Sequence, residues 1–389
     1  MEGYVAAVDL GTSKVLAMAA RKVGENKLEV IDTDSVHSSS WMLRGRIHDA
    51  NMAGYKVYLL INNFSPKLPS GLKQIYVGIG GQGLHTEPYS FKKELRGTVT
   101  KEMLEYLEAN ALENPGLLKI ETREYYLDGT LTLFPVGQIC TEIELKCLQV
   151  LARPDTEARK KLEKELSDHS SVEVAGFFVS PLATAEAALT VQQKKDGIAL
   201  VEIGAALTYV SVYKDNQLKL LVTIPLGGDA ITKDITALGI APAEAENLKR
   251  RTGIVLDEIE GTEPPPINQT IRARAIEICS NIFRQIQKQG FEATLKGKGI
   301  ILTGGGAQLK NFDKLLELES KMPVHLAPLD DHTQACVRGL LLLGTDNCAD
   351  DEVKVVAAEA KKEEPKKKKG QNWLEKTTTK FVGTLFNEQ

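Results

Sequence analysis

Length, composition and charge limit the kinds of protein that this chain can be. With 389 residues, of which 42% are apolar, it is long enough for two or more domains and has the composition of a soluble globular protein. The net charge of −4 does not favour a nucleic-acid-binding protein, and five scattered cysteines without a C-x-x-C pair predict free thiols in the cytosol rather than disulfides or a zinc site.

The first predicted element is a strand–turn–strand unit near the start of the chain, in the stretch YVAAVDLGTSKVLAMAARKV. A turn between two antiparallel strands can hold phosphate when its backbone N–H groups point inward and its side chains are small. Gly11 would allow a phosphate to approach, and Thr12 and Ser13 would donate hydrogen bonds. Lys14 would supply positive charge, and Asp9 would hold Mg²⁺ through a water molecule. A plain hairpin is the alternative interpretation of this unit.

The segment from residue 84 to residue 166 mixes helix and strand patterns. It contains a predicted helix at residues 100–110, two strand-like runs, REYYLDGTLTLF and TEIELKCLQVLA, and a charged helix in DTEARKKLEKEL. This mixture predicts a small α+β domain that is inserted into the first half of the chain.

A second strand–turn–strand unit, IALVEIGAALTYVSVYKDNQL, repeats the plan of the first about half a chain later. Aligning Glu202 with Asp9 places Gly204 on Gly11, which indicates an internal duplication. The second turn is less suited to phosphate, because two alanines and Leu207 follow Gly204 where glycines would allow close approach. Alanine with positive φ is costly, and Glu202 is one methylene longer than aspartate, so we expect a nucleotide site with a weakened hydrolytic half. An ordinary hairpin beside an empty cleft is the alternative.

A helical segment and a third glycine turn complete the body of the chain. Residues 237–298 contain a predicted helix in APAEAENLKRRTG, a proline-rich break at residues 263–266 and a long predicted helix, NQTIRARAIEICSNIFRQIQKQGFEA. In the following stretch, GIILTGGGAQL, a buried strand pattern runs into Gly304, Gly305 and Gly306. This is again a turn of the phosphate-binding type.

The end of the chain combines a charged linker with a short amphipathic stretch. The linker, residues 346–370, is poor in bulky apolar residues and is predicted to be disordered. On a helical wheel, the bulky residues of NWLEKTTTKFVGTLF share one side and Lys376 and Lys380 lie opposite, which is typical of a helix in a membrane interface. Docking on a partner or on the body is the alternative. The predicted membrane-contacting residues are Lys366, Lys367, Lys368, Lys369, Trp373, Leu374, Phe381, Val382, Leu385 and Phe386.

The order of these motifs resembles that of the actin, sugar-kinase and heat-shock-chaperone ATPase superfamily, whose members bind ATP between two duplicated halves. In IPLGGDAIT, the residues Gly227, Gly228 and Asp229 look like the Gly-Gly-Asp that follows the second phosphate loop of bacterial actins. In AENLKRRTG, Glu246 and Lys249 stand at the positions of the acid and the lysine beside the ribose. The stretch TGGGAQL is similar to the adenosine loop.

Within this superfamily the chain looks most like the FtsA family of bacterial cell division. The resemblance rests on the position and element order of the insert, on SSSWMLRGRIHDANMA, on QTIRARAIEI and on the charged linker with its amphipathic end. It implies a two-lobed actin-like α/β fold, with a small α+β insert in the first lobe and a C-terminal amphipathic helix. The implied domains are 1–83 and 167–195 for the first lobe, 84–166 for the insert, 196–236 and 299–345 for the second lobe, 237–298 for a lid, 346–370 for the linker and 371–389 for the helix.

The resemblance also implies ligands for the chain. The cofactors would be ATP and Mg²⁺, with Asp9 as the metal residue and with Asp9 and Glu202 as possible acids that position the metal or water. We assign no firm catalytic residue and expect at most a weak ATPase. The implied nucleotide-binding residues are Gly11, Thr12, Ser13, Lys14, Gly204, Thr208, Gly227, Gly228, Asp229, Glu246, Lys249, Gly304, Gly305 and Gly306.

By the same resemblance, the partners would be the C-terminal tail of FtsZ, further copies of the chain in a filament, other divisome proteins and an anionic lipid surface. Arg272 and Arg274 of the lid are the expected FtsZ contacts. The chain would then be a peripheral membrane protein on the cytoplasmic face of the bacterial inner membrane, at the division septum.

Two other functions are weighed against this one. A small-molecule kinase of the same superfamily would need a catalytic base and a sugar-sized pocket, and the altered second turn argues against it. A pilus-assembly adaptor of the PilM type shares the insert, but the amphipathic end argues against it. We therefore expect an actin-like scaffold that binds ATP, polymerises and tethers FtsZ filaments to the membrane.

Overall fold

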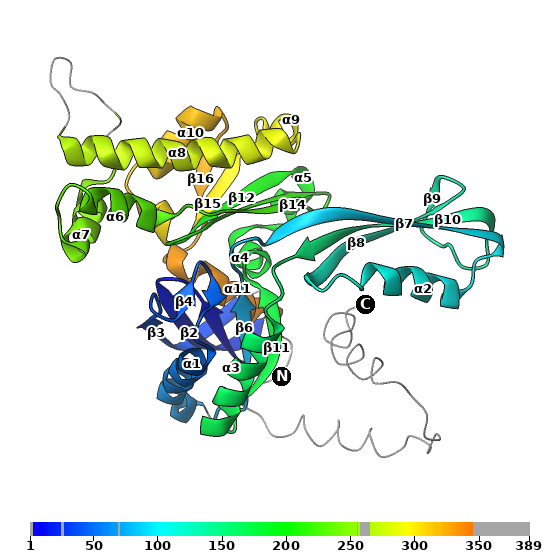
Figure 1. Ribbon diagram of the computed structural model, residues 1–389, viewed down its shortest axis with the longest axis horizontal. Helices are drawn as coiled ribbons and strands as arrows, with labels where there is room; N and C mark the ends of the chain where they lie inside the picture. Colours follow the sequence, from blue (N-terminus) through cyan, green and yellow to red (C-terminus); the bar gives the residue numbers. More distant parts are fainter. Residues whose placement is uncertain (1–2, 25–26, 69–70, 255, 257–264, 345–389) are drawn as a thin grey trace.

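The computed structural model describes residues 3–24, 27–68, 71–254, 256 and 265–344. Two lobes lie one above the other, and an elongated arm extends sideways from the region between them (Figure 1). The predicted linker at 346–370 and the predicted helix at 371–389 lie outside the described residues. In the described part of the chain, no helix is both long enough and apolar enough to cross a lipid bilayer.

The first lobe is built on a five-stranded sheet with the strand order β11-β6-β1-β2-β3. β1 and β2 form the predicted antiparallel hairpin, and β6 pairs in parallel with both β1 and β11. Four consecutive residues of β1, from Val5 to Val8, are buried because helices pack against this sheet on both faces. The elements of this lobe are β1 (Gly3–Leu10), β2 (Lys14–Gly24), β3 (Lys27–His37), β4 (Met42–Leu43), β5 (Arg46–Ile47), α1 (Ala50–Phe64), η1 (Ser65–Lys67), β6 (Gln74–Ile79), α3 (Thr156–His169), β11 (Glu173–Val179), α4 (Ser180–Ala188) and α11 (Ala335–Leu343).

The second lobe repeats this plan with the strand order β16-β15-β12-β13-β14. β12 and β13 form the second predicted hairpin, and β15 pairs in parallel with β12 as β6 does with β1. The long helix α8 lies along the outside of this lobe (Figure 1), and its buried residues recur at helical spacing. The elements are α5 (Val191–Asp196), β12 (Ile198–Ile203), β13 (Thr208–Lys214), β14 (Gln217–Ile224), α6 (Gly228–Thr236), α7 (Pro242–Thr252), α8 (Pro266–Lys288), α9 (Glu292–Leu295), β15 (Ile300–Thr303), η2 (Gly305–Gln308), α10 (Phe312–Ser320), β16 (Val324–Leu326) and η3 (His332–Gln334).

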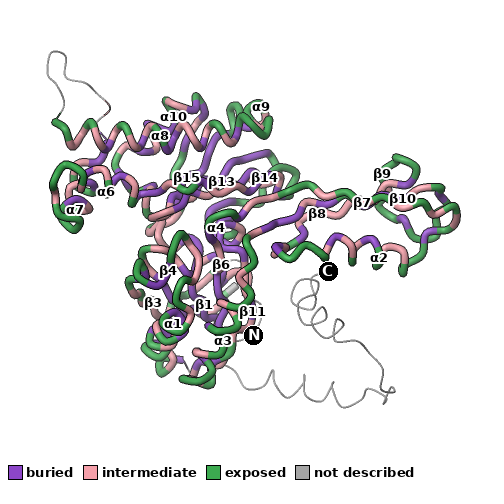
Figure 2. Tube along the Cα trace, in the orientation of Figure 1, coloured by how far each residue is buried: buried purple, intermediate pink, exposed green. Residues whose placement is uncertain are grey.

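The arm corresponds to most of the predicted insert and has a hydrophobic core of its own, which includes Val99, Leu107 and Ile143. Figure 2 shows buried positions concentrated in the strands of the two lobes, and long exposed stretches in the arm. The predicted helix at 100–110 is α2, and Thr100 accepts the capping hydrogen bond at its start. The elements are β7 (His85–Thr98), α2 (Lys101–Ala111), β8 (Leu117–Leu127), β9 (Thr130–Thr132) and β10 (Ile139–Leu151).

Several predicted boundaries differ from the structure. α11 falls within the predicted second lobe at 299–345 but lies in the first lobe, because Cys336 and Leu340 are buried in the core of that lobe. The charged helix of the predicted insert, α3, belongs to the first lobe, because Leu162 and Leu166 are buried in the same core as residues of α1. The sheet of the arm continues the sheet of the second lobe, since β7 pairs with β14 where His85 faces Val222. The long predicted helix ends at Lys288 rather than reaching residue 293. Gly290, with φ of +74°, breaks it before α9 begins.

Candidate functional site

The two predicted phosphate-type turns face each other across the lobes. Gly45, in the hairpin that joins β4 to β5, lies beside both of them. Its backbone N–H donates to Thr12 Oγ1 over 2.8 Å. On its other side, a Cβ on Gly45 would lie 3.2 Å from Leu207 Cδ1. A further contact crosses the lobes nearby, because the N–H of Gly81 donates to the Tyr209 hydroxyl over 2.7 Å. The duplicated hairpins therefore form the walls of one cleft.

The first turn is anchored by Ser38, which follows β3. The Ser38 hydroxyl donates to the carbonyl oxygens of Gly11, at 2.7 Å, and Thr12, at 3.0 Å, and its N–H donates to that of Ser13 at 3.1 Å. A Cβ on Gly11 would lie 2.4 Å from the carbonyl oxygen of Lys14, so only glycine fits there. Because Ser38 takes up the carbonyl groups, the shape of this turn is fixed without any ligand.

Lys14 reaches from the first lobe to the second. Its Nζ donates to Thr333 Oγ1 over 2.9 Å, and the Thr333 hydroxyl donates to Asp331 Oδ1 over 2.7 Å. Burial alone would raise the pKa of Asp331, but the hydrogen bonds from Thr333 hold it below its ordinary value. Thr333 also lies near Gly305, where a Cβ would be 3.6 Å from its Cγ2. The structure thus brings Lys14 beside the third glycine turn.

The glycines of the third turn have different roles. Gly304 has φ of +87°, and a Cβ there would lie 2.5 Å from the carbonyl oxygen of Ile203. A Cβ on Gly306 would lie 2.3 Å from Ile203 Cγ2. These two glycines are therefore needed for packing against β12. At Gly305 a Cβ would meet only Thr333 Cγ2, at an ordinary contact distance of 3.6 Å, so packing does not require a glycine there.

Two carboxyl groups, Asp9 and Glu202, lie at the bottom of the cleft. Burial raises the pKa of Asp9, although hydrogen bonds from Cys336 and Ser180 act to lower it. The Ser180 hydroxyl is 3.4 Å from Asp9 Oδ1. Burial, together with the charge of Asp9, raises the pKa of Glu202 to about 8. A hydrogen bond from the neighbouring Thr184 hydroxyl acts in the opposite direction on this pKa. The two carboxyl groups therefore form a buried acidic pair.

The second turn is formed without backbone strain, which corrects one expectation. Positive φ was expected at its alanines, but none of the positive-φ residues in the described chain lies in this turn. Its carbonyl groups face the start of α6: the N–H of Gly228 donates to Gly204 O over 3.0 Å, and that of Asp229 donates to Ala205 O over 2.8 Å. The Thr208 hydroxyl is committed to the carbonyl of Leu226 at 2.8 Å. The Thr208 hydroxyl is therefore not free to donate to a phosphate.

Glu246 and Lys249, on α7, form a partly buried network with α6. Lys249 Nζ lies 2.6 Å from Glu246 Oε2 and donates to Thr232 Oγ1 at 2.9 Å and to the carbonyl of Gly228 at 3.1 Å. Burial alone would raise the pKa of Glu246, but hydrogen bonds from Lys249, Thr232 and Arg250 lower it to about 2. The predicted pair is thus assembled at one end of the cleft, where it also holds the lid together.

The predicted partner residues on α8 are less accessible than expected. Arg274 Nε lies 2.6 Å from Asp234 Oδ2 on α6, and its guanidinium also pairs with Glu277. Arg272 is half-buried and also has an interaction partner. Exposed cations on the same helix are Arg284 and Lys288. The predicted membrane residues lie outside the described part of the chain.

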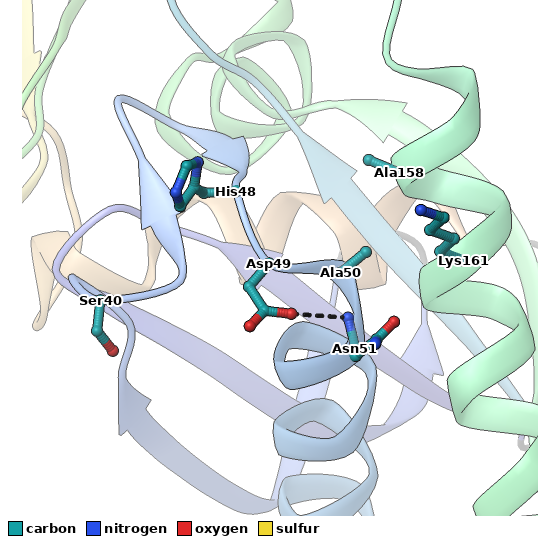
Figure 3. A pocket seen from close by; sticks show the side chains of 7 residues that line it. All are labelled: Ser40, His48, Asp49, Ala50, Asn51, Ala158 and Lys161. Atoms are coloured by element: carbon teal, nitrogen blue, oxygen red, sulfur yellow. Dashed lines mark hydrogen bonds between the residues drawn. The ribbon is translucent and has the colours of Figure 1, made fainter.

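A separate open hollow of about 570 Å³ lies where α1 begins, between Lys161 of α3 and His48 (Figure 3). Asp49 already accepts hydrogen bonds from the N–H groups of Asn51 and Met52 at the start of α1. Because these donors are capped, the hollow offers less to an anion than its position suggests.

Sequence reasoning missed Ser38, Gly45, Tyr209 and Thr333, which complete the cleft. Thr333 lies 319 residues from Lys14 in the chain, and no local pattern marks either residue as a neighbour of the other. For Ser38, a serine 27 residues after Gly11 gave no sign that it would hold the first turn. Ser38 and Gly45 reach the first turn through the folding of the first lobe, whereas Tyr209 and Thr333 reach the cleft only because the two lobes pack together.

Residues 199–339, which include the second and third turns, match the family model for Cell division protein FtsA. FtsA of Porphyromonas gingivalis is 25% identical over 339 residues, covering 80% of this chain and 70% of that protein. FtsA of Escherichia coli K12 is 22% identical over 393 residues, covering 90% of this chain and 92% of that protein. The chain belongs to the FtsA family. It is therefore a cell division protein with an actin-like fold.

Solved structures agree with this FtsA-family chain at the level of the fold. A chain of the PilM–PilN type IV pilus biogenesis complex has a TM-score of 0.62 at 15% identity, covering 88% of this chain and 98% of that chain. MreB5 of Spiroplasma citri bound to ADP has a TM-score of 0.54 at 13% identity, covering 92% of this chain and 98% of that chain. At such identities the likeness shows the actin-like α/β fold alone.

Proposed function

We propose that this protein is a nucleotide-binding scaffold of cell division that assembles into filaments and holds FtsZ at the cytoplasmic face of the membrane. The observation that carries the proposal is the cleft: in a chain of the FtsA family, two phosphate-type turns meet across the lobes and Lys14 lies beside the third glycine turn. Its septal location and its contacts with other divisome proteins are part of the same proposal.

The residues of the cleft fit an adenine nucleotide. The base would lie against Gly305, which carries no side chain, and the network of Glu246 and Lys249 would lie beside the ribose. The turn from Gly11 to Lys14 would hold phosphate oxygens. MreB5 of Spiroplasma citri, which shares the fold, has been solved with ADP and with AMPPNP. We therefore propose ATP as the nucleotide that first enters the cleft.

Asp9 and Glu202 are the acids of the cleft that could hold Mg²⁺ through water. Bound Mg²⁺ would neutralise phosphate charge there. Glu202 is one methylene longer than an aspartate and would shift any metal or water that it holds. We therefore propose slow hydrolysis or none, and a turnover of several per second would contradict this.

Membrane attachment is assigned to the amphipathic stretch at residues 371–389. Its apolar side, with Trp373 and Phe381, would enter the interface, and the lysines at 366–369 would be attracted by anionic lipid. One such helix binds weakly and reversibly. Filaments of the body would present many copies together, which raises the overall affinity without any new contact. Attachment and self-assembly should therefore be coupled.

A pull-down on an immobilised FtsZ C-terminal peptide tests the partner half of the proposal, with the full chain as prey and a scrambled peptide as control. Vesicle flotation tests the other half: FtsZ should float with anionic vesicles only when the chain is present. If the chain floats but FtsZ does not, the scaffold lacks its proposed partner, and the likeness to PilM would make a pilus-type adaptor the better candidate. Phosphate transfer to a small-molecule substrate would instead favour a kinase.

A further inference from the structure

A second hollow lies where the arm joins the first lobe, and none of the proposed nucleotide-binding residues lines it. Its lining includes Arg46 of β5, Arg159 of α3 and Arg153, which follows β10. Leu118 of β8 contributes to its wall from the arm. The hollow is small, about 20 Å³, and Arg153 is exposed at its edge. A group bound here would contact the arm and the first lobe together.

Positive charge is in excess around this hollow. Three guanidinium groups and one carboxylate, that of Asp155, line it, so two positive charges are left over. Within the described residues, none of these three arginines forms an ion pair with a carboxylate. Burial raises the pKa of Asp155 although Arg46 and Arg159 act to lower it, so Asp155 is not a strong partner for either arginine.

Arg159 lacks a hydrogen-bond partner for a buried donor. Its Nε is buried, and no acceptor for it is found among the described residues. Its guanidinium lies over the ring of Phe177, with Cζ 5.7 Å from the ring centre. A buried donor without an acceptor is costly, and more so when it is charged. An anion in the hollow would supply the missing acceptor.

Arg46 and Arg159 are held in position without a ligand. Arg46 Nη2 donates to the carbonyl of Pro154 over 3.3 Å, and a Cβ on Gly81 would lie 2.6 Å from Arg46 Cγ. The ring of Phe177 supports the guanidinium of Arg159. Side chains that are already ordered lose little conformational freedom on binding. A planar guanidinium can also offer two parallel N–H groups to phosphate oxygens.

We propose that Arg46, Arg153 and Arg159 bind a phosphate dianion at the root of the arm. The two surplus positive charges match inorganic phosphate or a phosphate monoester, which carries a charge of about −1.5 to −2 near pH 7. The small volume admits the phosphate group and leaves the rest of a larger molecule outside. This inference does not depend on the proposed nucleotide binding.

The position of Arg46 links this site to the cleft. The preceding residue, Gly45, donates its N–H to the Thr12 hydroxyl in the first turn. Arg46 also packs over Gly81, whose N–H donates to Tyr209 in the second lobe. A phosphate that holds Arg46 therefore steadies two of the contacts that shape the cleft.

Equilibrium dialysis of the full chain against labelled inorganic phosphate, in about 0.15 M KCl to screen exposed lysines, tests the inference. The wild type is expected to bind one phosphate per chain with a Kd of about 10 mM or below. Arg159→Gln should weaken binding at least about tenfold, because it removes a charged, buried donor. Arg153→Gln, at an exposed position, should also weaken binding and serves if Arg159→Gln does not fold.

Labelled glycerol phosphate, as a second probe, distinguishes the sources of the phosphate group. Tighter binding of inorganic phosphate supports a site for the free ion, and tighter binding of glycerol phosphate supports a site for a monoester such as a lipid headgroup. In both cases the same arginine variants should weaken binding of the preferred probe.

Arg96→Gln is the matched control, because Arg96 lies on the arm, is 80% exposed and is 3.6 Å from Glu94. It should bind phosphate as the wild type does. Lys14→Met shows whether phosphate enters the cleft instead, and retained binding in this variant supports the site at the arm. Binding that is lost in Lys14→Met but kept in Arg153→Gln and Arg159→Gln would overturn the inference and favour the proposed cleft. Absence of binding by the wild type would also overturn it.

Discussion

Replacing Lys249 by methionine should destabilise the second lobe, because this buried cation joins α7 to α6. Only 9% of Lys249 is exposed, and its ammonium contacts three groups: Glu246, Thr232 and the carbonyl of Gly228. Methionine keeps most of the volume but removes the charge. Hydrogen bonds to charged groups contribute about 1.5–3 kcal/mol each and are not additive. Since Glu246 keeps Arg250 and Thr232 as partners, we expect Lys249→Met to lower the free energy of unfolding by about 2–4 kcal/mol.

The loss of unfolding free energy in the Lys249→Met variant should become smaller as the pH falls. The pKa of Glu246 is lowered from 4.5 to about 2 in the folded chain, so its stabilising contribution is present above pH 4.5 and is lost as the pH falls toward 2. Without Lys249, this pKa should return part of the way toward its ordinary value. The difference between wild type and variant is therefore largest near neutral pH and shrinks on acidification.

Urea unfolding of the wild type and of Lys249→Met, near neutral pH and at about pH 3, measures the difference in their unfolding free energies. Arg251→Met is the matched control, since Arg251 lies on the same helix, is 70% exposed and faces Glu244 at 3.3 Å. The free energy of unfolding of Arg251→Met should lie less than about 0.5 kcal/mol below that of the wild type. Equal losses for the two variants, or a Lys249→Met effect that does not change with pH, would refute the proposed network.

The remaining predictions concern the ligand, the partner and the membrane. Gly305→Val should leave the thermal unfolding temperature unchanged, because a Cβ there meets only Thr333 Cγ2 at 3.6 Å. It should weaken ATP binding about tenfold by filling the proposed base site, and a titration with a fluorescent ATP analogue would measure this. Reversing the exposed Arg284 and Lys288 to glutamate should abolish co-sedimentation with FtsZ without loss of stability; retained binding would place the FtsZ contact elsewhere. Trp373→Glu should release the chain from anionic vesicles in flotation, and changing the lysines at 366–369 to glutamine should weaken binding and its salt dependence; a Trp373→Glu chain that still floats would mean that another segment is the anchor.

The sequence predicted the elements that depend on local pattern. Both hairpins could be recognised because continuous apolar runs flank a turn beginning with Gly11 or Gly204, and each strand is buried on both faces. The end of α8 could not be placed, since a single glycine at 290 is compatible with a helix until its φ is known. The prediction that the charged helix α3 belongs to the insert was wrong, because its two buried leucines indicate a packed face but not that this face packs against α1 in the body of the first lobe.

In the candidate site, too, features that depend on neighbouring residues could be predicted, whereas contacts between residues far apart in the chain could not. Gly304 and Gly306 could be predicted as a special turn, because their sequence is unusual. That a side chain would be tolerated at Gly305, but not at Gly304 or Gly306, depends on where Ile203 and Thr333 lie. Likewise, Arg274 looked like a free surface cation in the helix pattern, and only the fold places Asp234 against it. Long-range pairs of this kind leave no periodic trace in one sequence.

Contacts across the cleft link ligand binding to the relative position of the lobes. Lys14 contacts Thr333, the N–H of Gly81 contacts Tyr209, and Leu207 faces the loop over the first turn. A ligand that enters must replace Thr333 as the partner of Lys14 and spread the turns apart. A ligand can shift a conformational equilibrium only by its difference in affinity for the two states. Phosphates that take over Lys14 supply such a difference, whereas the base beside Gly305, in contact with one lobe, supplies little. The number of phosphates, rather than the base, should therefore set the angle between the lobes and, with it, any filament contact to which both lobes contribute.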